Sequence, residues 1–418
     1  MLAAMPPHSP NRDEPVIRDR GDACPGALRL HAADDGRLAR LRLPAGVLTP
    51  RQALVLADAA DALGDGHLTI TSRGNLELRG LPDTCGAELA ALLRDAGLLP
   101  SDTHERVRNI VASPLSGLDG LGHGDVQLWA RELDALLCAT PWAARLSGRF
   151  LFALDDGRGD VRALGGDVTL VAEPGGLASV RVGDAAVRVR AADAPRAALA
   201  CARGFLEVAR GAWRVSELPD GVVVGAGACV AGVGVAVITE VAGAGAGDPE
   251  AGDPTAGPPV VPAVGRIGEA LSLHVKFGRL SSVHLRALAG GTELRFTPWR
   301  GVVVLGASGL PADLPAATGL VADPRDPWIG VGACTGRPGC GKALADVRAD
   351  AVAPPGALPV YFSGCARRCG HPRGTTWVDV VATGDGAYEV DGAPVPRTSP
   401  SPRTSLADAV AASRTTTR

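Results

Sequence analysis

Residues 48–80 read LTPRQALVLADAADALGDGHLTITSRGNLELRG and carry the signals of one helix and one β-hairpin. Thr49 is suited to cap a helix, and the apolar residues after it recur at helical spacing. A glycine turn then leads to the alternating strand LTIT, the basic turn SRGN and a second strand, LELRG. This order predicts a helix packed on a hairpin, which is half of an α+β sandwich.

A second stretch, residues 280–306, repeats the same order of signals. It reads LSSVHLRALAGGTELRFTPWRGVVVLG, with a serine cap, a helical stripe, the strand LRFT, the basic turn PWRG and the strand VVVLG. Thr71 aligns with Thr297, and Gly80 with Gly306. Chance similarity between two segments rich in Ala and Val is the alternative, but the shared order of elements favours a duplication.

The composition restricts the classes of protein to consider. The 418 residues are enough for two or more domains, and 46% of them are hydrophobic. No apolar run approaches a membrane span, and the first 25 residues lack the apolar core of a signal peptide, so we expect a cytoplasmic protein with no membrane contact. The net charge of −3 gives no reason to expect a nucleic-acid partner.

Four of the nine cysteines lie in two short glycine- and arginine-rich runs, CTGRPGC and SGCARRCGHP. Their spacing is C-x5-C, 24 residues, then C-x3-C, at Cys334, Cys340, Cys365 and Cys369. In a reducing compartment, clustered thiols indicate metal ligands or redox groups. The spacing is looser than zinc knuckles and differs from plant ferredoxin, but four thiolates on glycine-rich loops can surround an iron–sulfur cubane. Inert buried cysteines are the alternative.

Together, the cysteine spacing, the duplicated module and the stretches TSRGNLELRG and RVRNIVASPLSG resemble the sirohaem nitrite and sulfite reductase superfamily, and within it the precorrin-3B synthase family. The resemblance covers residues 26–392. It implies duplicated ferredoxin-like half-domains and reductase-type iron–sulfur domains in pseudo-two-fold halves. We therefore expect a disordered N-terminus at 1–25, half-domains at 26–100 and 263–312, reductase-type domains at 101–240 and 313–392, a flexible linker at 241–262 and a disordered tail at 393–418.

The resemblance also implies the cofactors and the chemistry. It assigns a [4Fe–4S] cluster to the four clustered cysteines and a tetrapyrrole to the cleft between the halves. A mononuclear non-haem iron is a further candidate cofactor, and sirohaem is a less favoured one. The family reaction is the oxygen-dependent hydroxylation of precorrin-3A at C20 with closure of a γ-lactone, a step of aerobic cobalamin biosynthesis. An external donor, NADH-linked or a ferredoxin, would supply the electrons.

Two departures separate this chain from the reductases. The reductases carry a K-x-K pair that faces the small anion, and the matching positions here hold Arg149 and Leu151. They also read C-P-N-x-C at the last two ligands, where this chain reads CARRCGHP. A leucine can neither anchor an anion nor donate a proton. The synthase is therefore the favoured function, and a sirohaem-dependent nitrite or sulfite reductase is the alternative.

A tetrapyrrole rimmed by carboxylates calls for arginines, whose fork binds a carboxylate with two hydrogen bonds. Arginines dominate the cations, since only Lys276 and Lys342 are lysines. We expect six residues to bind substrate: Arg73, Arg108, Asn109, Arg149, Arg300 and Arg367. Asn109 has the alternative of capping a turn.

His371 is our candidate catalytic residue, because it lies two positions after a cluster thiolate. It could donate to the cluster, ligate another iron, or be an ordinary loop histidine.

Two other interpretations were weighed, one for a glycine-rich segment and one for the function of the whole chain. The run VVVGAGACVAG at 222–232 resembles the start of a dinucleotide site, but we expect a glycine-rich hairpin there. An electron-transfer module without catalysis would explain the cysteines but not the arginines.

Overall fold

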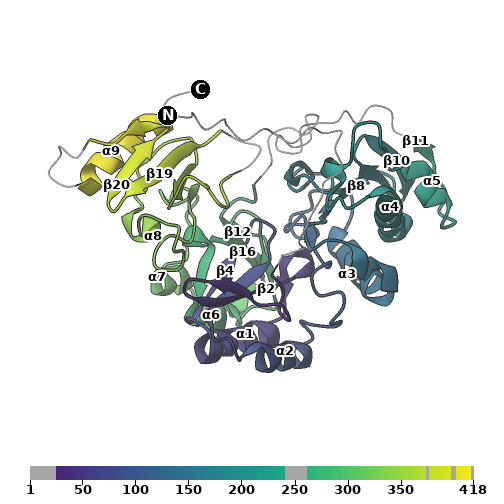
Figure 1. Cartoon of the computed structure of the whole chain (residues 1–418). Coiled ribbons are helices and arrows are strands. Elements are labelled where there is room, and N and C mark those ends of the chain that lie inside the picture. The colour runs from purple at the N-terminus through teal and green to yellow at the C-terminus, as the bar shows by residue number, and fades with distance from the viewer. Residues whose placement is uncertain (1–24, 241–260, 373–375, 397–401, 416–418) are drawn as a thin grey trace.

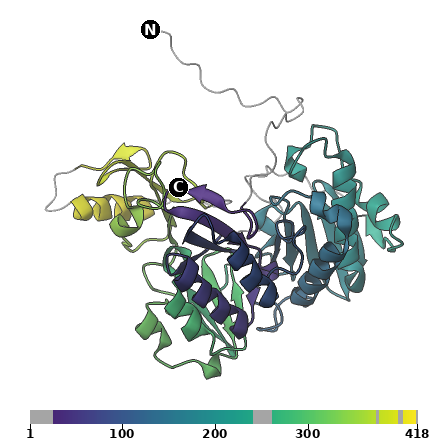
Figure 2. The ribbon, with the colours of Figure 1, turned by 60° about the horizontal axis from the view of Figure 1, so that its bottom comes forward.

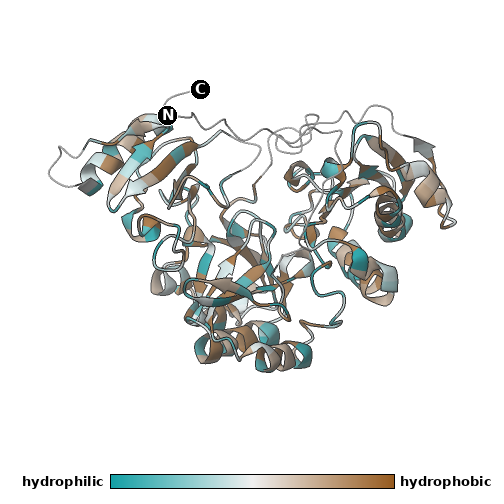
Figure 3. Cartoon of the chain, viewed as in Figure 1, coloured by the Kyte–Doolittle hydropathy of each residue, from teal (hydrophilic) through white to brown (hydrophobic). Residues whose placement is uncertain are grey.

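The computed structural model describes residues 25–240, 261–372, 376–396 and 402–415. It is an α+β protein with four sheets in these residues, which confirms the expected fold class. Two half-domains, purple and green in Figure 1, make a central body, and a teal domain and a yellow domain flank it. Apolar residues concentrate on the strands that fill these bodies (Figure 3). None of the described helices is both long and apolar enough to cross a membrane.

The first half-domain follows the order predicted from residues 48–80. Its elements are β1 (His31–Ala33), β2 (Gly36–Leu41), β3 (Val47–Leu48), α1 (Pro50–Leu63), β4 (His67–Ile70), β5 (Leu76–Leu81) and α2 (Gly86–Asp95). Thr49 caps α1 in a reciprocal capping box with Gln52, and Pro50 occupies the first helical position, where its missing N–H costs nothing.

The second half-domain repeats this order. Its elements are β12 (Gly265–Ile267), β13 (Ala270–His274), β14 (Arg279–Ser281), α6 (Ser282–Leu288), β15 (Glu293–Phe296), β16 (Gly301–Leu305) and α7 (Leu314–Thr318). Ser281 caps α6 as Thr49 caps α1, again in a capping box, here with His284. The duplication predicted from the sequence is confirmed.

Each half-domain lends one strand to the other. β3 pairs with β15, and β14 pairs with β4, so each sheet contains a strand of both copies. The exchange follows a tight turn in which Ala45 and Phe277 have nearly equal positive φ angles of 57° and 56°. Gly46 follows the first turn, and a Cβ there would lie 2.0 Å from the Phe296 carbonyl oxygen, so only glycine fits. The half-domains therefore share one core, and Figure 2 shows them side by side.

The teal domain is a sheet covered by helices. Its strands are β6 (Ile110–Ala112), β7 (Phe152–Asp155), β8 (Val168–Glu173), β9 (Leu177–Val182), β10 (Ala185–Arg190) and β11 (Thr239–Glu240), and its helices are α3 (Val126–Ala139), α4 (Ala194–Val208) and α5 (Ala226–Ala231). The strands β6, β7 and β8 are parallel, and β9 and β10 return antiparallel.

The yellow domain has the same strand directions. It contains β17 (Val331–Ala333), β18 (Val360–Ser363), β19 (Val378–Gly384), β20 (Ala387–Val390), β21 (Ala393–Pro394), α8 (Val347–Asp350) and α9 (Pro402–Thr415). The N–H of Cys334, after β17, donates to Phe362 O at 3.0 Å, and the N–H of Ser113, after β6, donates to Leu154 O at 3.0 Å. The duplication therefore extends to these flanking domains, in agreement with the pseudo-two-fold halves that the resemblance implied.

The prediction of a disordered tail at 393–418 is wrong for most of its length. Residues 393–394 extend the sheet, and α9 packs on it with Leu406 and Val410 buried. These two residues are four positions apart and share one helix face, a signal that the Pro, Ser, Thr and Arg content obscured. Arg414, in the last turn of the helix, donates to the carbonyls of Leu358 and Gly356.

The glycine-rich hairpin expected at 222–232 is also wrong. Gly225 begins the short helix α5, which packs on α4 with Val230 buried. Residues 222–224 form no strand, so the strand that a dinucleotide fingerprint needs is absent from this described segment. Most of the expected linker and N-terminus, residues 241–260 and 1–24, lies outside the described residues.

Candidate functional site

The four clustered cysteines lie on two loops at one edge of the yellow sheet. Cys334 and Cys340 follow β17, and Cys365 and Cys369 follow the neighbouring parallel strand β18, so both loops leave the sheet at its carboxyl edge. Burial raises the pKa of the Cys334 thiol, and the nearby thiols of Cys340 and Cys365 raise it further. The hydroxyl of Tyr361 on β18 donates to Cys369 O at 2.7 Å and holds the end of the second loop.

The loops offer backbone donors to sulfur. The N–H of Gly364 donates to Cys334 Sγ at 3.1 Å, as thiolate ligands of iron–sulfur clusters require for charge stabilisation. A Cβ at Gly364 would come within 2.8 Å of the Ala343 Cβ and 3.5 Å of Cys334 Sγ. Glycine is therefore needed here for the two loops to approach each other.

Two arginines at this edge bring positive charge that no carboxylate of the described residues neutralises. Arg348 Nε donates to Cys334 O at 3.2 Å, and Arg300 donates to Ile70 O at 2.6 Å. Burial lowers the pKa of Arg348, and the charges of Arg279 and Arg79 lower it further. A buried cation without an ion pair is unfavourable unless an anion lies nearby. Four thiolates and this excess of positive charge fit an anionic iron–sulfur cluster.

The first half-domain docks directly on the first cysteine loop. Arg79 on β5 forms a two-bond ion pair with Asp35, both bonds at 2.9 Å, and also donates to Gly339 O at 2.8 Å. Asp34 accepts from the Gly341 N–H at 2.6 Å. Arg79 thus joins the central body to the loop between Cys334 and Cys340.

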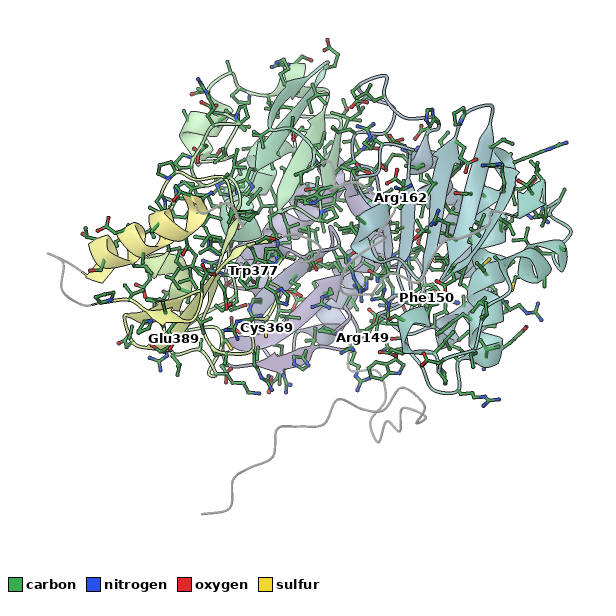
Figure 4. All side chains as sticks on the ribbon, turned by 90° about the horizontal axis from the view of Figure 1, so that it is seen from above. Arg149, Phe150, Arg162, Cys369, Trp377 and Glu389 are labelled. Carbon is green, nitrogen blue, oxygen red and sulfur yellow. The ribbon has the colours of Figure 1, made fainter. Side chains whose placement is uncertain are left out.

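Arg73 and Arg149 lie together where the first half-domain meets the teal domain. Arg73 donates to Arg149 O at 3.2 Å, and the exposed Arg149 guanidinium lies 5.0 Å from the ring centre of Trp213. In Figure 4, Arg149 and Cys369 lie on either side of the purple strands of the first half-domain. The structure leaves both arginines at the surface, where they could meet a ligand carboxylate.

The structure contradicts the substrate-binding roles of Arg108 and Asn109. Arg108 is 5% exposed and forms a two-bond ion pair with Asp134, at 2.6 and 2.7 Å. Asn109 is fully buried; its oxygen accepts from Arg42 and Asn75, and its amide donates to Phe150 O. These polar groups are occupied by the fold itself, and the motif could not show it because Asp134 lies on a distant helix.

The remaining site predictions lie around the second cysteine loop. Arg367 is exposed, whereas its neighbour Arg368 turns back to bond Asp379 at 2.6 Å. His371 Nδ1 lies 2.7 Å from Pro372 O, and its ring stacks on Trp377 at 5.3 Å between centres. These contacts are those of a loop histidine, and its catalytic role stays a prediction. Arg373, a further arginine near this loop in the sequence, lies outside the described residues.

Leu151 stands where the reductases carry the second lysine of their pair. It is 2% exposed and packs with Val111, Ala153 and Val161 against Trp299 of the second hairpin turn. This position is therefore part of an apolar wall between the teal domain and the central body, and its own side chain carries no charge to face an anion.

Comparison with known proteins supports the resemblance. Residues 31–96 match the nitrite/sulfite reductase ferredoxin-like half domain. A precorrin-3B synthase from Sinorhizobium is 26% identical over 385 residues, covering 86% of this chain and 80% of that protein. A ferredoxin–nitrite reductase from Synechococcus elongatus is 26% identical over 393 residues, covering 80% and 74%.

Among solved structures, the NirA protein of Mycobacterium tuberculosis shares the fold, with a TM-score of 0.62, 18% identity, and coverage of 89% of this chain and 79% of that one. The fold, the half-domain match and the chain-long similarities agree with the motifs read from the sequence. The chain is therefore an oxidoreductase that is similar, along most of its length, to precorrin-3B synthase and to ferredoxin–nitrite reductase.

Proposed function

We propose that this chain is a precorrin-3B synthase-like monooxygenase of aerobic cobalamin biosynthesis, acting in the cytoplasm. One atom of oxygen would enter C20 of precorrin-3A, the other would leave as water, and an external donor would supply two electrons. The observation that carries the proposal is the placement of four cysteines and two unneutralised arginines, Arg300 and Arg348, beside the hairpin turns of the duplicated module. An electron-transfer module would have no use for this arrangement of the half-domains.

The four cysteines are the proposed ligands of a [4Fe–4S] cluster, which when bound supplies electrons one at a time. The chain's own contribution is to hold and insulate it. Gly364 donates to the Cys334 sulfur, Tyr361 fixes the backbone at Cys369, and Arg348 offsets negative charge. A mononuclear iron or a sirohaem stays a further candidate, for which no described residue offers a distinctive ligand set.

Arg300 is the strongest candidate for a substrate carboxylate. Its φ of 64° is unusual for a side chain with a Cβ, and the equivalent position of the first copy is Gly74, with a φ of 69°. Such strain costs about 1–3 kcal/mol and persists where a side chain is needed in one place. One guanidinium nitrogen is bonded to Ile70 O, and another lies beside Gly370, next to the second cysteine loop. Arg73, Arg149 and Arg367 are the weaker candidates.

The reductase alternative predicts a cation near the reacting anion, and Leu151 is an apolar residue in a buried wall instead. Losing one positioned donor typically costs on the order of 10²–10³ in rate, and a six-electron reduction needs such donors repeatedly. A tetrapyrrole oxidation has no small anion to hold, so an apolar side chain there costs it little.

The visible spectrum of anaerobically purified protein and its turnover of sulfite and nitrite test this choice. We expect a broad cluster absorption without Soret or α bands, and no sulfide or ammonia from a chemically reduced sample. Strong sirohaem bands together with brisk sulfide or ammonia formation would establish the reductase alternative.

A further inference from the structure

The teal domain has its own version of the loops that carry the cysteines. The Asp156 N–H donates to Ser113 Oγ at 3.0 Å, and the Gly364 N–H donates to Cys334 Sγ at 3.1 Å. The same strand ends and the same backbone donor thus recur in both domains, with serine in place of the first thiol. The end of β7 and the loop after it, residues 155–160, read DDGRGD and are called the DDGRGD loop here. Nothing in the proposed function uses this loop.

Three carboxylates of this loop converge in the interior. Asp155, Asp156 and Asp160 are each fully buried, and one oxygen from each lies within 4.8 Å of the others. Buried acidic groups are normally paired with a cation or protonated. In the teal domain the cation at hand is Arg158, which bonds Asp156 and Asp119.

Arg158 does not neutralise the other two carboxylates. All of its bonds in the described structure go to Asp156, Asp119 and the Leu121 carbonyl. Asp155 accepts from four backbone N–H groups: those of Gly157, Gly159, Val161 and Arg162. These dipoles orient the carboxylate and leave its formal charge in place.

One carboxylate oxygen of Asp160 lacks a hydrogen-bond partner, and this observation points to a bound ligand. Its Oδ1 accepts from Ser113 Oγ at 2.5 Å and from the Val161 N–H at 2.8 Å. Its Oδ2 is buried and makes no hydrogen bond to any described residue, the neighbouring carboxylates Asp155 and Asp156 included. An oxygen that is ionised needs a donor or a cation, and one that is protonated needs an acceptor; neither is provided by the described protein groups.

We propose that Asp155, Asp156 and Asp160 bind one hard divalent cation, of the class of Mg²⁺, Mn²⁺ or Ca²⁺. The donor set contains oxygen alone, and hard oxygen ligands select these ions over Zn²⁺ or copper. Non-haem iron sites of oxygenases typically add two histidines, and no histidine belongs to this group in the described structure, so the cation is not assigned as a redox centre. Figure 4 shows Arg162, two residues after the loop, on a different domain from Cys369.

The cation would act structurally. It would join the DDGRGD loop to β7 and hold Ser113 in the position that Cys334 has in the yellow domain. The two flanking domains would then use one backbone scaffold for two kinds of ligand, a soft cluster held by sulfur and a hard ion held by carboxylates.

The test uses the full-length protein with its cluster intact. Divalent metals are first quantified by plasma mass spectrometry in protein passed over chelating resin, and MnCl₂ is then titrated while free Mn²⁺ is followed by electron paramagnetic resonance. We expect co-purified and added cations to total one per chain. Asp160→Asn should weaken binding by about 10-fold or more, with unchanged iron and sulfide contents. Asp184→Asn, at an exposed turn of the same domain, should bind as the wild type does.

Two results would overturn the proposal. One is a wild-type protein with neither a co-purified divalent cation nor saturable Mn²⁺ binding up to about 1 mM, the weak end of protein sites for such ions. The other is an Asp160→Asn variant that binds as tightly as the wild type. If that variant does not fold, the wild-type titration decides alone, with Mg²⁺ and Ca²⁺ as competitors.

Discussion

The cysteine loops of the yellow domain and the acidic loop of the teal domain are built on the same backbone and differ in their side chains. Cys334 and Ser113 occupy equivalent positions, as do Gly364 and Asp156. Where the yellow domain has a glycine that lets the two cysteine loops approach each other, the teal domain has a buried carboxylate. The comparison teaches that the ends of the strands set the positions of the candidate ligand residues. The side chains at these few positions then decide which kind of ligand each domain could bind.

The largest expected effect comes from giving the yellow domain the residue that the teal domain has. Cys334→Ser should abolish cluster binding, because the serine hydroxyl does not replace a thiolate as an iron ligand. Iron and sulfide analysis of the purified variant should show near-complete loss.

Cys229→Ser is the matched control, since Cys229 lies between helices of the teal domain away from the loops. Its iron and sulfide contents should equal those of the wild type. A full cluster in the Cys334 variant, or its loss in the Cys229 variant, would contradict the assignment of ligands.

The second expected effect concerns Arg108 and Arg300, which the sequence analysis both assigned to substrate binding. Arg108→Ala should lower the free energy of unfolding by about 3 kcal/mol, because it leaves Asp134 without its partner in a largely buried ion pair. Chemical denaturation measures this. A variant as stable as the wild type would show that the Arg108–Asp134 contact does not support the fold.

Arg300 should behave in the opposite way. Arg300→Lys keeps the charge and loses the fork, so tetrapyrrole binding should weaken by about 10-fold while the denaturation midpoint hardly changes. Fluorescence or absorbance titration with the macrocycle measures the binding. Unchanged affinity would remove Arg300 from the substrate site, and loss of stability without loss of affinity would make it a structural residue like Arg108.

The smallest expected effect is on the pH dependence of stability, and it concerns one pair of equivalent residues in the two half-domains. The turn geometry makes Arg42 and His274 equivalent, because each lies three residues before the residue with the positive φ angle, Ala45 or Phe277. Arg42 is a buried cation whose donors reach Asn109 and two carbonyls, whereas burial lowers the pKa of His274 to about 4. His274 is therefore neutral in the folded protein at pH 6, while the unfolded chain binds a proton there.

Because the unfolded state binds more protons, stability should fall as the pH drops from 6.5 towards 4. His274 alone should contribute a loss of about 0.8 kcal/mol between pH 7.5 and 6. Denaturation at both pH values, in wild type and in His274→Gln, measures it. An equal pH dependence in both proteins would show that His274 is not responsible.

The sequence predicted those parts of the molecule that depend on local order. Thr49 and Ser281 cap helices and the two hairpins form. These features follow from periodicity, capping residues and spacing, which are visible along the chain.

Features that depend on distant partners could not be predicted in this way. Arg108 was assigned to substrate because its partner Asp134 lies on a separate helix, and the role of Arg348 depends on where four other groups fold. The helix α9 was missed because only Leu406 and Val410 distinguish it from a disordered segment. The proposed role of the DDGRGD loop could not be predicted, since the equivalence of Ser113 and Cys334 exists only in the folded sheets.

The central claim is that the chain oxidises a tetrapyrrole with molecular oxygen. The direct measurement is mass spectrometry of precorrin-3A after incubation with reduced enzyme, an electron donor and oxygen labelled with the heavy isotope. We predict one labelled oxygen atom in the product, and none in reactions with the Cys369→Ser variant. An unlabelled or unchanged macrocycle, accompanied by rapid reduction of nitrite or sulfite by the same preparation, would contradict the claim.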